Sequence, residues 1–536
     1  MLPLLSYYCS LLVLSGLIGT STPAPAAPLP ATQGLTLGPD SVVRVAAGPQ
    51  YKRGWLHSLF WGFHYRDEWA VPVAAPVFNM QTAVPGGLKP VQEGGSFQTK
   101  NLRLVAPNGQ QFVLRSVDKD ATVALPENMR DGMIGRLMKD QTSVIHPYGA
   151  YIVPQLAEAA GVYHTNPRLV YVADDPALGE FRKAFANALY LFEERPEGDQ
   201  SSVRSFGSSA HVVSSRSVFG HLLLNAQHRV DARQYLRSRL FDMWLGDWSR
   251  REDQWRWAAF PAPDSAVLYR AIPRDRDHAF FKFDDGVWTR LISFLKTNYQ
   301  TFTREIRLHD VEGLNRAARP MDKSLLVYLT EEDFRQVADS LRQRLTDPVI
   351  ARAVGVWPKE VYALSGQEFE DKLRSRREQL PRVAEEFYRQ LARDVEIPGT
   401  DQPDHFIVEA AGPWKVRVRV LSAGLGGHER MVGERVFDAR QTGTINLYGL
   451  GSNDTFDIIG APDRRIRIGI YDGQGQDLIQ QLQSPDRRGP DMKVTVYDSG
   501  DGNTLKLDKD LVEVKAYIPK ATEYDGAGWL LRHRLY

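Results

Sequence analysis

Cysteine is nearly absent from this chain: its 536 residues include one, Cys9. Cys9 lies in an uncharged apolar stretch at residues 4–18, and Ala-Pro-Ala follows at residues 24–26 as a small-residue cleavage pattern. We therefore expect residues 1–26 to be a secretory signal peptide and the mature protein to contain no cysteine. This excludes disulfide bonds, catalysis by a thiolate and metal ligation by cysteine.

Net charge and long apolar runs are lacking as well. The formal net charge is +1, which argues against a nucleic-acid partner and against charge-driven binding to an anionic membrane. Beyond the amino-terminal stretch no segment has about 18 consecutive apolar residues, so we expect no transmembrane span in the mature chain. These features predict an exported protein of the periplasm, the outer membrane or the cell surface.

The length predicts two to four domains, because single cores stop growing at about 250–300 residues. A linker rich in proline, alanine and threonine is expected at residues 27–49. An α+β region is expected at 50–200 and a mostly helical region at 201–397. Beyond a proline-containing break the apolar residues alternate with period two, which predicts an all-β, sandwich-like domain at 401–536.

A hairpin is the clearest local prediction. Strand-like runs at residues 101–105 and 111–117 are joined by Pro-Asn-Gly at 107–109, a strong turn signal. Other strands are expected at 169–172, 188–192 and 267–272, with the end of a helix as the alternative for 188–192. Other helices are expected at 148–161, at 231–245 with Asp231 as N-cap and Gly246 as stop, and after capping boxes at Thr330 and Ser365, the last with a kink near Pro381.

Glycines and basic side chains near this hairpin suit a phosphate. Gly94 and Gly95 precede it, and a glycine-rich turn lets backbone N–H groups approach a phosphate. On the second strand Arg115 is the cation best placed to reach that phosphate, and Lys119 is the second choice.

Residues 240–257, LFDMWLGDWSRREDQWRW, place four of the eleven tryptophans among charged side chains. The loop that leaves the preceding helix holds residues 247–254, and a second acidic loop, Arg-Asp-Arg-Asp, follows at 274–277. Two acidic loops with hydrophobic flanks can converge on one divalent cation, and their oxygen ligands suit Mg²⁺ or Mn²⁺. A metal or an arginine must neutralise the converging carboxylates.

The order of glycine-rich hairpin, strand cation, helix, Gly-Asp loop, strand and aspartate resembles atypical protein kinases, whose relatives include the HipA toxins, the spore-coat CotH kinases and the Golgi casein kinases. It is most similar to a Bacteroidetes envelope segment whose loop runs G-D-W-D-R-H-E-D-Q-W and whose later motif runs P-R-D-R-D. There the segment often lies between a metallophosphoesterase and a surface-antigen barrel, neither of which is recognised in this sequence. The resemblance implies a bilobal kinase-like α+β domain, ATP with Mg²⁺ or Mn²⁺, and an outer-membrane or envelope partner.

Several site residues follow from this resemblance. Gln254 matches a metal-binding position, and Asp277 matches the metal-holding aspartate, with Asp275 as second candidate. Glu193 and Glu194 resemble a hinge that faces the adenine of a nucleotide.

The catalytic loop matches the resemblance only in part. Asp247 and Arg250 match, but Ser249 occupies the place of the catalytic aspartate and Arg251 the place of a histidine. Serine does not accept a proton as a carboxylate does, so phosphoryl transfer is expected to be impaired unless Asp247 substitutes. The resemblance implies a kinase-like protein or pseudokinase that binds a nucleotide with metal or another phosphorylated ligand.

Two readings compete with this one. Asp247, Arg250 and Asp277 also suit a buried ion-pair network beneath tryptophan rings. The whole chain also suits an envelope-associated structural or interaction protein, since ATP is scarce outside the cytoplasm.

The C-terminal region offers a second metal motif. YGLGSNDTFDI at 448–458 and YDGQGQDLI at 471–479 each resemble half of a calcium-binding nonapeptide. Tight turns rich in glycine and asparagine are the alternative, because no tandem repeat covers the chain. If Ca²⁺ binds, Asp454 and Asp477 are the candidate ligands.

Overall fold

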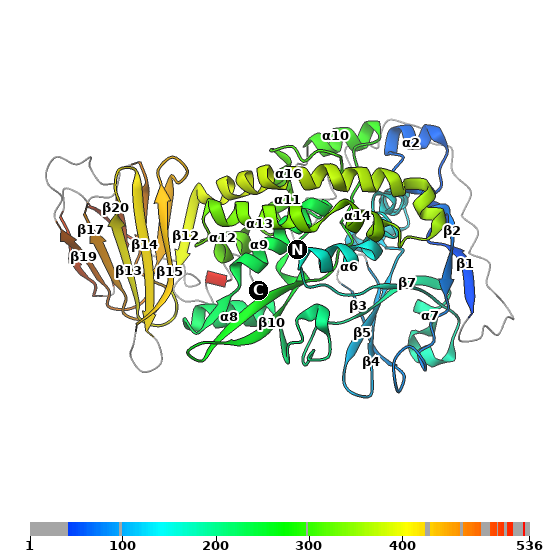
Figure 1. Ribbon diagram of the computed structural model, residues 1–536, viewed down its shortest axis with the longest axis horizontal. Helices are drawn as coiled ribbons and strands as arrows, with labels where there is room; N and C mark the ends of the chain where they lie inside the picture. Colours follow the sequence, from blue (N-terminus) through cyan, green and yellow to red (C-terminus); the bar gives the residue numbers. More distant parts are fainter. Residues whose placement is uncertain are drawn as a thin grey trace.

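The computed structural model describes residues 41–95, 99–295, 299–423, 429–460, 465–483, 494–500, 502–508, 512–517 and 529–530. The expected signal peptide lies outside these residues. The molecule is elongated, with an antiparallel sheet near one end, helices in the middle and a β-rich region at the other end (Figure 1).

The N-terminal sheet is antiparallel and has the order β3-β4-β5-β7-β6. Alternate residues of its central hairpin are buried, which confirms the two strands and the turn predicted there. Its strands are β3 (Lys89–Gly94), β4 (Asn101–Val105), β5 (Gln111–Ser116), β6 (Arg168–Val172) and β7 (Ala188–Glu194).

Part of the expected linker is folded. Strand β1 (Val42–Ala46) pairs with β2 (Pro72–Pro76), so the prediction of a linker up to residue 49 is wrong for this stretch. Val43 and Val45 pack against the core, which the proline-rich composition nearby did not indicate. The helices of this half are α2 (Trp55–Trp61), α3 (Arg66–Ala70), α4 (Glu127–Arg130), α5 (Met133–Asp140), α6 (Gly149–Ala160) and α7 (Arg182–Phe185).

The middle of the molecule is mostly helical, with one small four-stranded sheet of order β8-β10-β11-β9. Strands β10 and β11 form a long antiparallel ribbon that pairs Trp255 with Pro273 at its base. The strands are β8 (His211–Ser214), β9 (His228–Val230), β10 (Trp255–Ala262) and β11 (Ala266–Pro273). The helices are α8 (Ser215–Leu224), α9 (Ala232–Leu245), α10 (Val287–Leu295), α11 (Asp310–Asn315), α12 (Arg319–Leu325), α13 (Glu331–Arg344), α14 (Asp347–Val354), α15 (Lys359–Val361) and α16 (Gln367–Ala392).

The predicted helix ends are mostly confirmed. Asp231 caps α9 by accepting from the backbone N–H of Gln234, and Gly246 ends it with φ of 73°. Thr330 and Asp333 form the predicted capping box of α13. Ser365 does not begin a helix, because a π turn at Tyr362–Gly366 joins α15 directly to α16.

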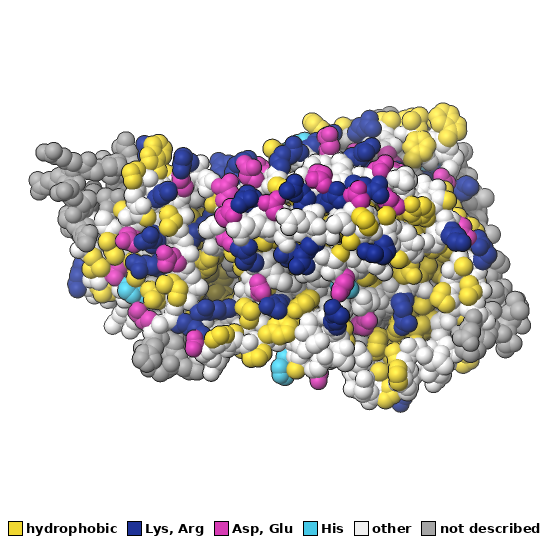
Figure 2. All heavy atoms as spheres, viewed as in Figure 1, with side chains coloured by type: hydrophobic (Ala, Val, Ile, Leu, Met, Phe, Trp, Pro, Cys, Tyr) yellow, Lys and Arg dark blue, Asp and Glu magenta, His cyan; other side chains and the backbone are white. Residues whose placement is uncertain are grey.

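Helices α13 and α16 carry mixed charges on their exposed sides, visible as alternating blue and magenta side chains in Figure 2. Pairs such as Lys372–Glu368 and Arg335–Asp339 lie one helical turn apart, an arrangement that supports an exposed helix. Within the described segments no helix combines the length and apolar character needed to cross a bilayer.

The C-terminal region is all β, as expected, but its topology differs from an ordinary antiparallel sandwich. Residues 404–438 form a three-stranded antiparallel meander within one sheet. From residue 444 onward, successive strands alternate between two packed sheets and pair in parallel with the strand one coil earlier, so this part of the chain winds as a two-sheet coil. One sheet holds β12 (Asp394–Pro398), β16 (Thr444–Tyr448), β18 (Arg467–Tyr471), β20 (Val494–Asp498) and β22 (Val512–Ala516). The other holds β13 (Asp404–Ala410), β14 (Lys415–Ala423), β15 (Glu429–Asp438), β17 (Thr455–Ile459), β19 (Leu478–Gln483) and β21 (Thr504–Lys506).

The region therefore begins at Asp394, earlier than predicted, and it contains a repeat that the sequence reading did not identify. Equivalent side chains stack from coil to coil: Tyr448 on Tyr471 at 4.7 Å, and Tyr471 on Tyr497 at 4.3 Å. These distances match the spacing of neighbouring strands. A tyrosine followed six residues later by aspartate or asparagine was the sequence signal of the repeat.

Candidate functional site

A cavity of about 380 Å³ lies between the N-terminal sheet and the β10–β11 ribbon. Both sides contribute charged side chains, and seven of the residues predicted for the site line it. The predicted residues are Gly94, Gly95, Arg115, Glu193, Glu194, Gln254 and Asp275; the other lining residues are Asn101, Arg103, Val113, Thr165, Arg195, Pro196, Asp253, Arg256 and Arg274.

Arg115 is the centre of the polar cluster at this cavity. Its side chain is nearly buried, and its Nη1 donates to Glu193 Oε1 at 3.1 Å. Its Nη2 lies 2.6 Å from Asp275 Oδ1 and 2.8 Å from Asp277 Oδ2. Lys119 pairs with the same oxygen of Asp277. The two predicted cations and the two predicted aspartates thus form one cluster.

These contacts shift the pKa values of the cluster. Burial opposes ionisation of Asp275, but Arg115 and Lys119 outweigh it and hold the pKa of Asp275 well below its usual range. Burial likewise lowers the pKa of Arg115, but the carboxylates of Asp275, Asp277 and Glu193 outweigh it and raise that pKa. Burial raises the pKa of Glu193, and the charge of Arg115 opposes the rise. Three carboxylates, of Glu193, Asp275 and Asp277, thus share two cations, Arg115 and Lys119, in one ion-pair cluster.

Backbone geometry fixes the two ends of the site. Asp275 has a left-handed backbone, with φ of 55°, which aspartate tolerates better than most residues. Gly95 has φ of 136°, and a Cβ atom there would lie 2.1 Å from the carbonyl oxygen of Thr99. Glycine is therefore required at Gly95, where the strand turns above the cavity.

The two acidic loops meet, but an arginine joins them. Arg250 Nη2 donates to Asp247 Oδ2 at 2.6 Å, and its Nη1 donates to the backbone carbonyls of Arg274 and Asp275. Asp242 accepts from Arg250 as well, and from Arg239 and Arg276. Asp247 and Arg250 thus belong to a fully buried ion-pair network. This is the arrangement that the sequence analysis gave as the alternative to a ligand site for these two residues.

Asp247 itself does not line the cavity. Its side chain has no exposed surface, and burial raises its pKa against the charge of Arg250. Ser249 Oγ lies 3.3 Å from Asp247 Oδ1 and 3.0 Å from His278 Nδ1. Burial, together with Lys119, lowers the pKa of His278 to about 4, so this ring is neutral at neutral pH. Sequence reasoning missed His278, whose only signal was its place directly after the second aspartate.

The remaining predicted residues are already hydrogen bonded. Glu193 Oε2 accepts from Thr165 at 2.6 Å, and Glu194 accepts from the backbone N–H of Asn166 at 3.0 Å. Gln254 Oε1 accepts from the backbone N–H of Arg251 at 3.1 Å. Across the ranges that the structure describes, no group of three or more histidine, cysteine, aspartate and glutamate side chains is arranged to hold a metal.

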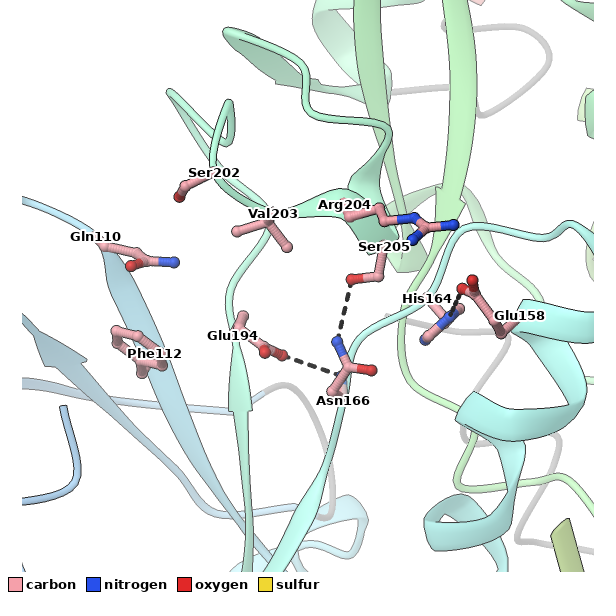
Figure 3. Close-up of a pocket in the computed structure, with 10 residues that line it drawn as sticks. All are labelled: Gln110, Phe112, Glu158, His164, Asn166, Glu194, Ser202, Val203, Arg204 and Ser205. Carbon is pink, nitrogen blue, oxygen red and sulfur yellow. Dashed lines mark hydrogen bonds and ion pairs between the residues drawn. The ribbon is translucent and has the colours of Figure 1, made fainter. Parts of the chain in front are cut away.

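A second cavity, of about 470 Å³, lies beside the first and shares Glu194 with it. Figure 3 shows Asn166 between Glu194 and Ser205, with His164 facing Glu158. Its lining has one arginine, Arg204, where the first cavity has five. The first cavity, which has clustered arginines and the Arg115 carboxylates, is therefore the stronger candidate for a ligand site.

Comparisons with known proteins give little further identification. No protein-family model matches the sequence, and no curated protein matches it. The structure is similar to the crystal structure of the Helicobacter pylori proinflammatory kinase CtkA, with a TM-score of 0.26 and 11% identity. That similarity covers 56% of this chain and 94% of that chain.

Proposed function

We propose that the cavity between the N-terminal sheet and the β10–β11 ribbon binds a phosphorylated ligand, in an exported, kinase-like protein whose phosphoryl transfer is impaired. The observation that carries the proposal is the gathering of five arginines, Arg115 among them, along the wall of this cavity. Arginine binds phosphate through paired N–H groups, and a glycine turn leaves room for the ligand.

Impaired transfer follows from the loop. Ser249 replaces the expected carboxylate and is hydrogen bonded to His278, while Asp247 is buried against Arg250. Neither residue presents a carboxylate to the cavity. A loss of general-base catalysis typically costs about 10²–10⁴-fold in rate.

A divalent cation belongs to this proposal as an ion that the ligand brings with it. The carboxylates of Asp275 and Asp277 would supply the oxygen ligands for Mg²⁺ or Mn²⁺. The resemblance to atypical kinases adds Gln254 as a further ligand. These carboxylates are already neutralised by Arg115 and Lys119. The cation therefore has to compete with two basic side chains for them.

Thermal melting of the full mature chain tests the proposal. We expect millimolar ATP to raise the melting temperature by mass action, and Mg²⁺ or Mn²⁺ to change the size of that rise. Replacement of Lys119 by Gln should reduce the shift. No shift with ATP or with any other phosphate compound tested would contradict the proposal.

The double change Ser249→Asp, Arg251→His tests whether the loop is a disabled transfer loop. Autophosphorylation gained by this variant, with ATP and Mg²⁺, would support a kinase origin. Its matched control is Ser249→Ala, Arg251→His, which restores no carboxylate.

A second candidate function is an envelope-associated interaction protein. Exposed apolar side chains favour it: Trp55, Leu56, Leu59 and Phe63 of α2 and its end, and Val287, Leu291, Phe294 and Leu295 of α10. These two helices contact each other, and hydrophobic side chains over α2 are visible at the upper right in Figure 2. If this function holds, Trp55→Ser with Phe294→Ser should release the protein from the envelope fraction without lowering its melting temperature.

A further inference from the structure

Four arginines line the candidate cavity in addition to Arg115. Arg103 lies on β4 and Arg195 directly after β7, so both belong to the N-terminal sheet side. Arg256 lies on β10 and Arg274 directly after β11, on the opposite side. Like charges therefore face one another across the cavity.

Three of these arginines have no carboxylate partner among the described side chains. Arg103 Nη1 donates to the side-chain oxygen of Gln92 at 2.8 Å. Arg256 and Arg274 donate to the backbone carbonyls of Trp255 and Asp253, at 3.0 and 2.9 Å. Nε of Arg274 is buried and has no hydrogen-bond partner. The fourth, Arg195, pairs with Glu197 at 2.8 Å.

The acids that line the cavity compensate these charges only in part, because most of them are bound by other groups. Glu193 and Asp275 are held by Arg115, and Asp253 is held by Arg251 at 2.9 Å. Glu194 accepts from a backbone N–H. The three unpaired arginines thus form an excess of positive charge in a partly buried place.

The pKa values of two arginines that line the cavity are lowered by burial and by repulsion from neighbouring arginines. Burial, and then the charges of Arg256 and Arg195, lower the pKa of Arg274 to about 9. Burial and the charge of Arg195 also lower the pKa of Arg103. Such crowding costs free energy unless an anion lies among the guanidinium groups.

We infer that the cavity binds a polyanion with two or more phosphate groups, one of them held by Arg103, Arg256 and Arg274 and another at the Arg115 end. This inference rests on the proposed function and names its ligand class. Val113 and Pro196 are the lining residues with wholly apolar side chains, so a nucleobase finds little apolar surface there. The phosphate chain, and not a base, supplies most of the binding free energy.

Calorimetric titration of the full mature chain tests this with sodium tripolyphosphate, orthophosphate and adenosine as probes. Tripolyphosphate should bind more tightly than orthophosphate, and adenosine should show no binding. The double variant Arg256→Gln, Arg274→Gln should weaken tripolyphosphate binding about tenfold or more, since charge-assisted hydrogen bonds are lost. Arg103→Gln, on the other wall, should weaken it in the same direction.

Arg270→Gln is the matched control. Arg270 lies on β11 four residues before Arg274, pairs with Asp231 at 3.1 Å and does not line the cavity. This variant removes the same charge from the same ribbon and should change tripolyphosphate affinity less than twofold. A similar loss in this control would mean that net charge alone governs binding, which overturns the inference.

Stability gives a second readout. Without ligand, the variant Arg256→Gln, Arg274→Gln should melt at the same temperature as the wild type or higher, because repulsion between the arginines is relieved. A lower melting temperature would show that these arginines stabilise the fold, and it would overturn the inference. Tripolyphosphate binding that survives the double variant but not Lys119→Gln would overturn the inference and leave the proposed function standing. Absence of binding by every phosphate compound would overturn both.

Discussion

Arg115 Nη2 lies 2.6 Å from Asp275 Oδ1, although 160 residues separate them in the chain. This contact connects the second strand of the N-terminal hairpin to the loop that follows the β10–β11 ribbon. It closes one end of the cavity, and it neutralises an aspartate that would otherwise be left with uncompensated charge.

Arg115→Gln should destabilise the protein by about 3–5 kcal/mol, because it leaves the buried carboxylates of Glu193 and Asp277 short of a counter-charge. Urea unfolding followed by circular dichroism measures the change. Arg168→Gln is the control: it lies at an exposed position on β6, beyond β7 in the same sheet, and loses only a contact with the Phe192 ring, so it should stay within about 1 kcal/mol of the wild type. A loss below about 1 kcal/mol for Arg115→Gln would show that the cluster is less tightly coupled than its contacts indicate.

Asp242→Asn should also cost about 3–5 kcal/mol, because this fully buried carboxylate accepts from Arg239, Arg250 and Arg276. Thermal and urea unfolding measure it. The comparison is Arg389→Gln on α16, whose exposed ion pair with Glu385 should contribute too little to change the melting temperature. Equal effects of the two variants would contradict the network described here.

Asp454→Asn should make stability less dependent on pH. Burial, with Asp404, Asp477 and Asp472 adding to it, raises the pKa of Asp454 to about 10. The folded protein therefore binds this proton more tightly than the unfolded chain, whose aspartates titrate near pH 3.9. This stabilisation is complete below about pH 4 and is lost as the pH rises toward 10. We expect the wild-type melting temperature to fall from pH 5 to pH 9 and the variant to fall less.

The structure itself indicates that asparagine fits this place. Asp454 accepts from the backbone N–H of Asp404, and Asp477 accepts from that of Asp454 at 2.7 Å. In the next coil Asn503 accepts from the N–H of Asp477 at 2.9 Å, 26 residues further on. Asp394→Asn, at an exposed position, is the control. If Ca²⁺ instead raises the melting temperature and Asp454→Asn abolishes that rise, this row of stacked aspartates is a calcium site.

Ser249→Asp should raise the pKa of His278 from about 4 toward neutrality, since a new carboxylate would lie where Ser249 Oγ now contacts the ring. The same change places a charge beside Asp247 and should lower stability at neutral pH. NMR titration of the histidine ring measures the first effect. Ser249→Ala is the comparison, and an equal pKa rise in that variant would show that the lost hydrogen bond, not the charge, is responsible.

Local patterns predicted the parts of the site that lie close together in sequence. The Pro-Asn-Gly turn predicted the hairpin, and the hairpin placed Arg115 on its second strand. Asp275 and Asp277 follow a strand whose length was visible from its apolar run. The partner of Arg115 was not predictable: Glu193 was assigned to a hinge, and its carboxylate reaches Arg115 only because β5 and β7 pair.

The sequence by itself determined the capped helices, the hairpin and the alternating strands, because each depends on side chains within a few residues of one another. The tertiary structure alone decided that Arg250 joins the two acidic loops, that five arginines line one cavity, and that most C-terminal strands pair in parallel. Each of these depends on contacts between residues tens to hundreds of positions apart, and the free energy of such contacts is set by burial and charge that exist only after the chain has folded.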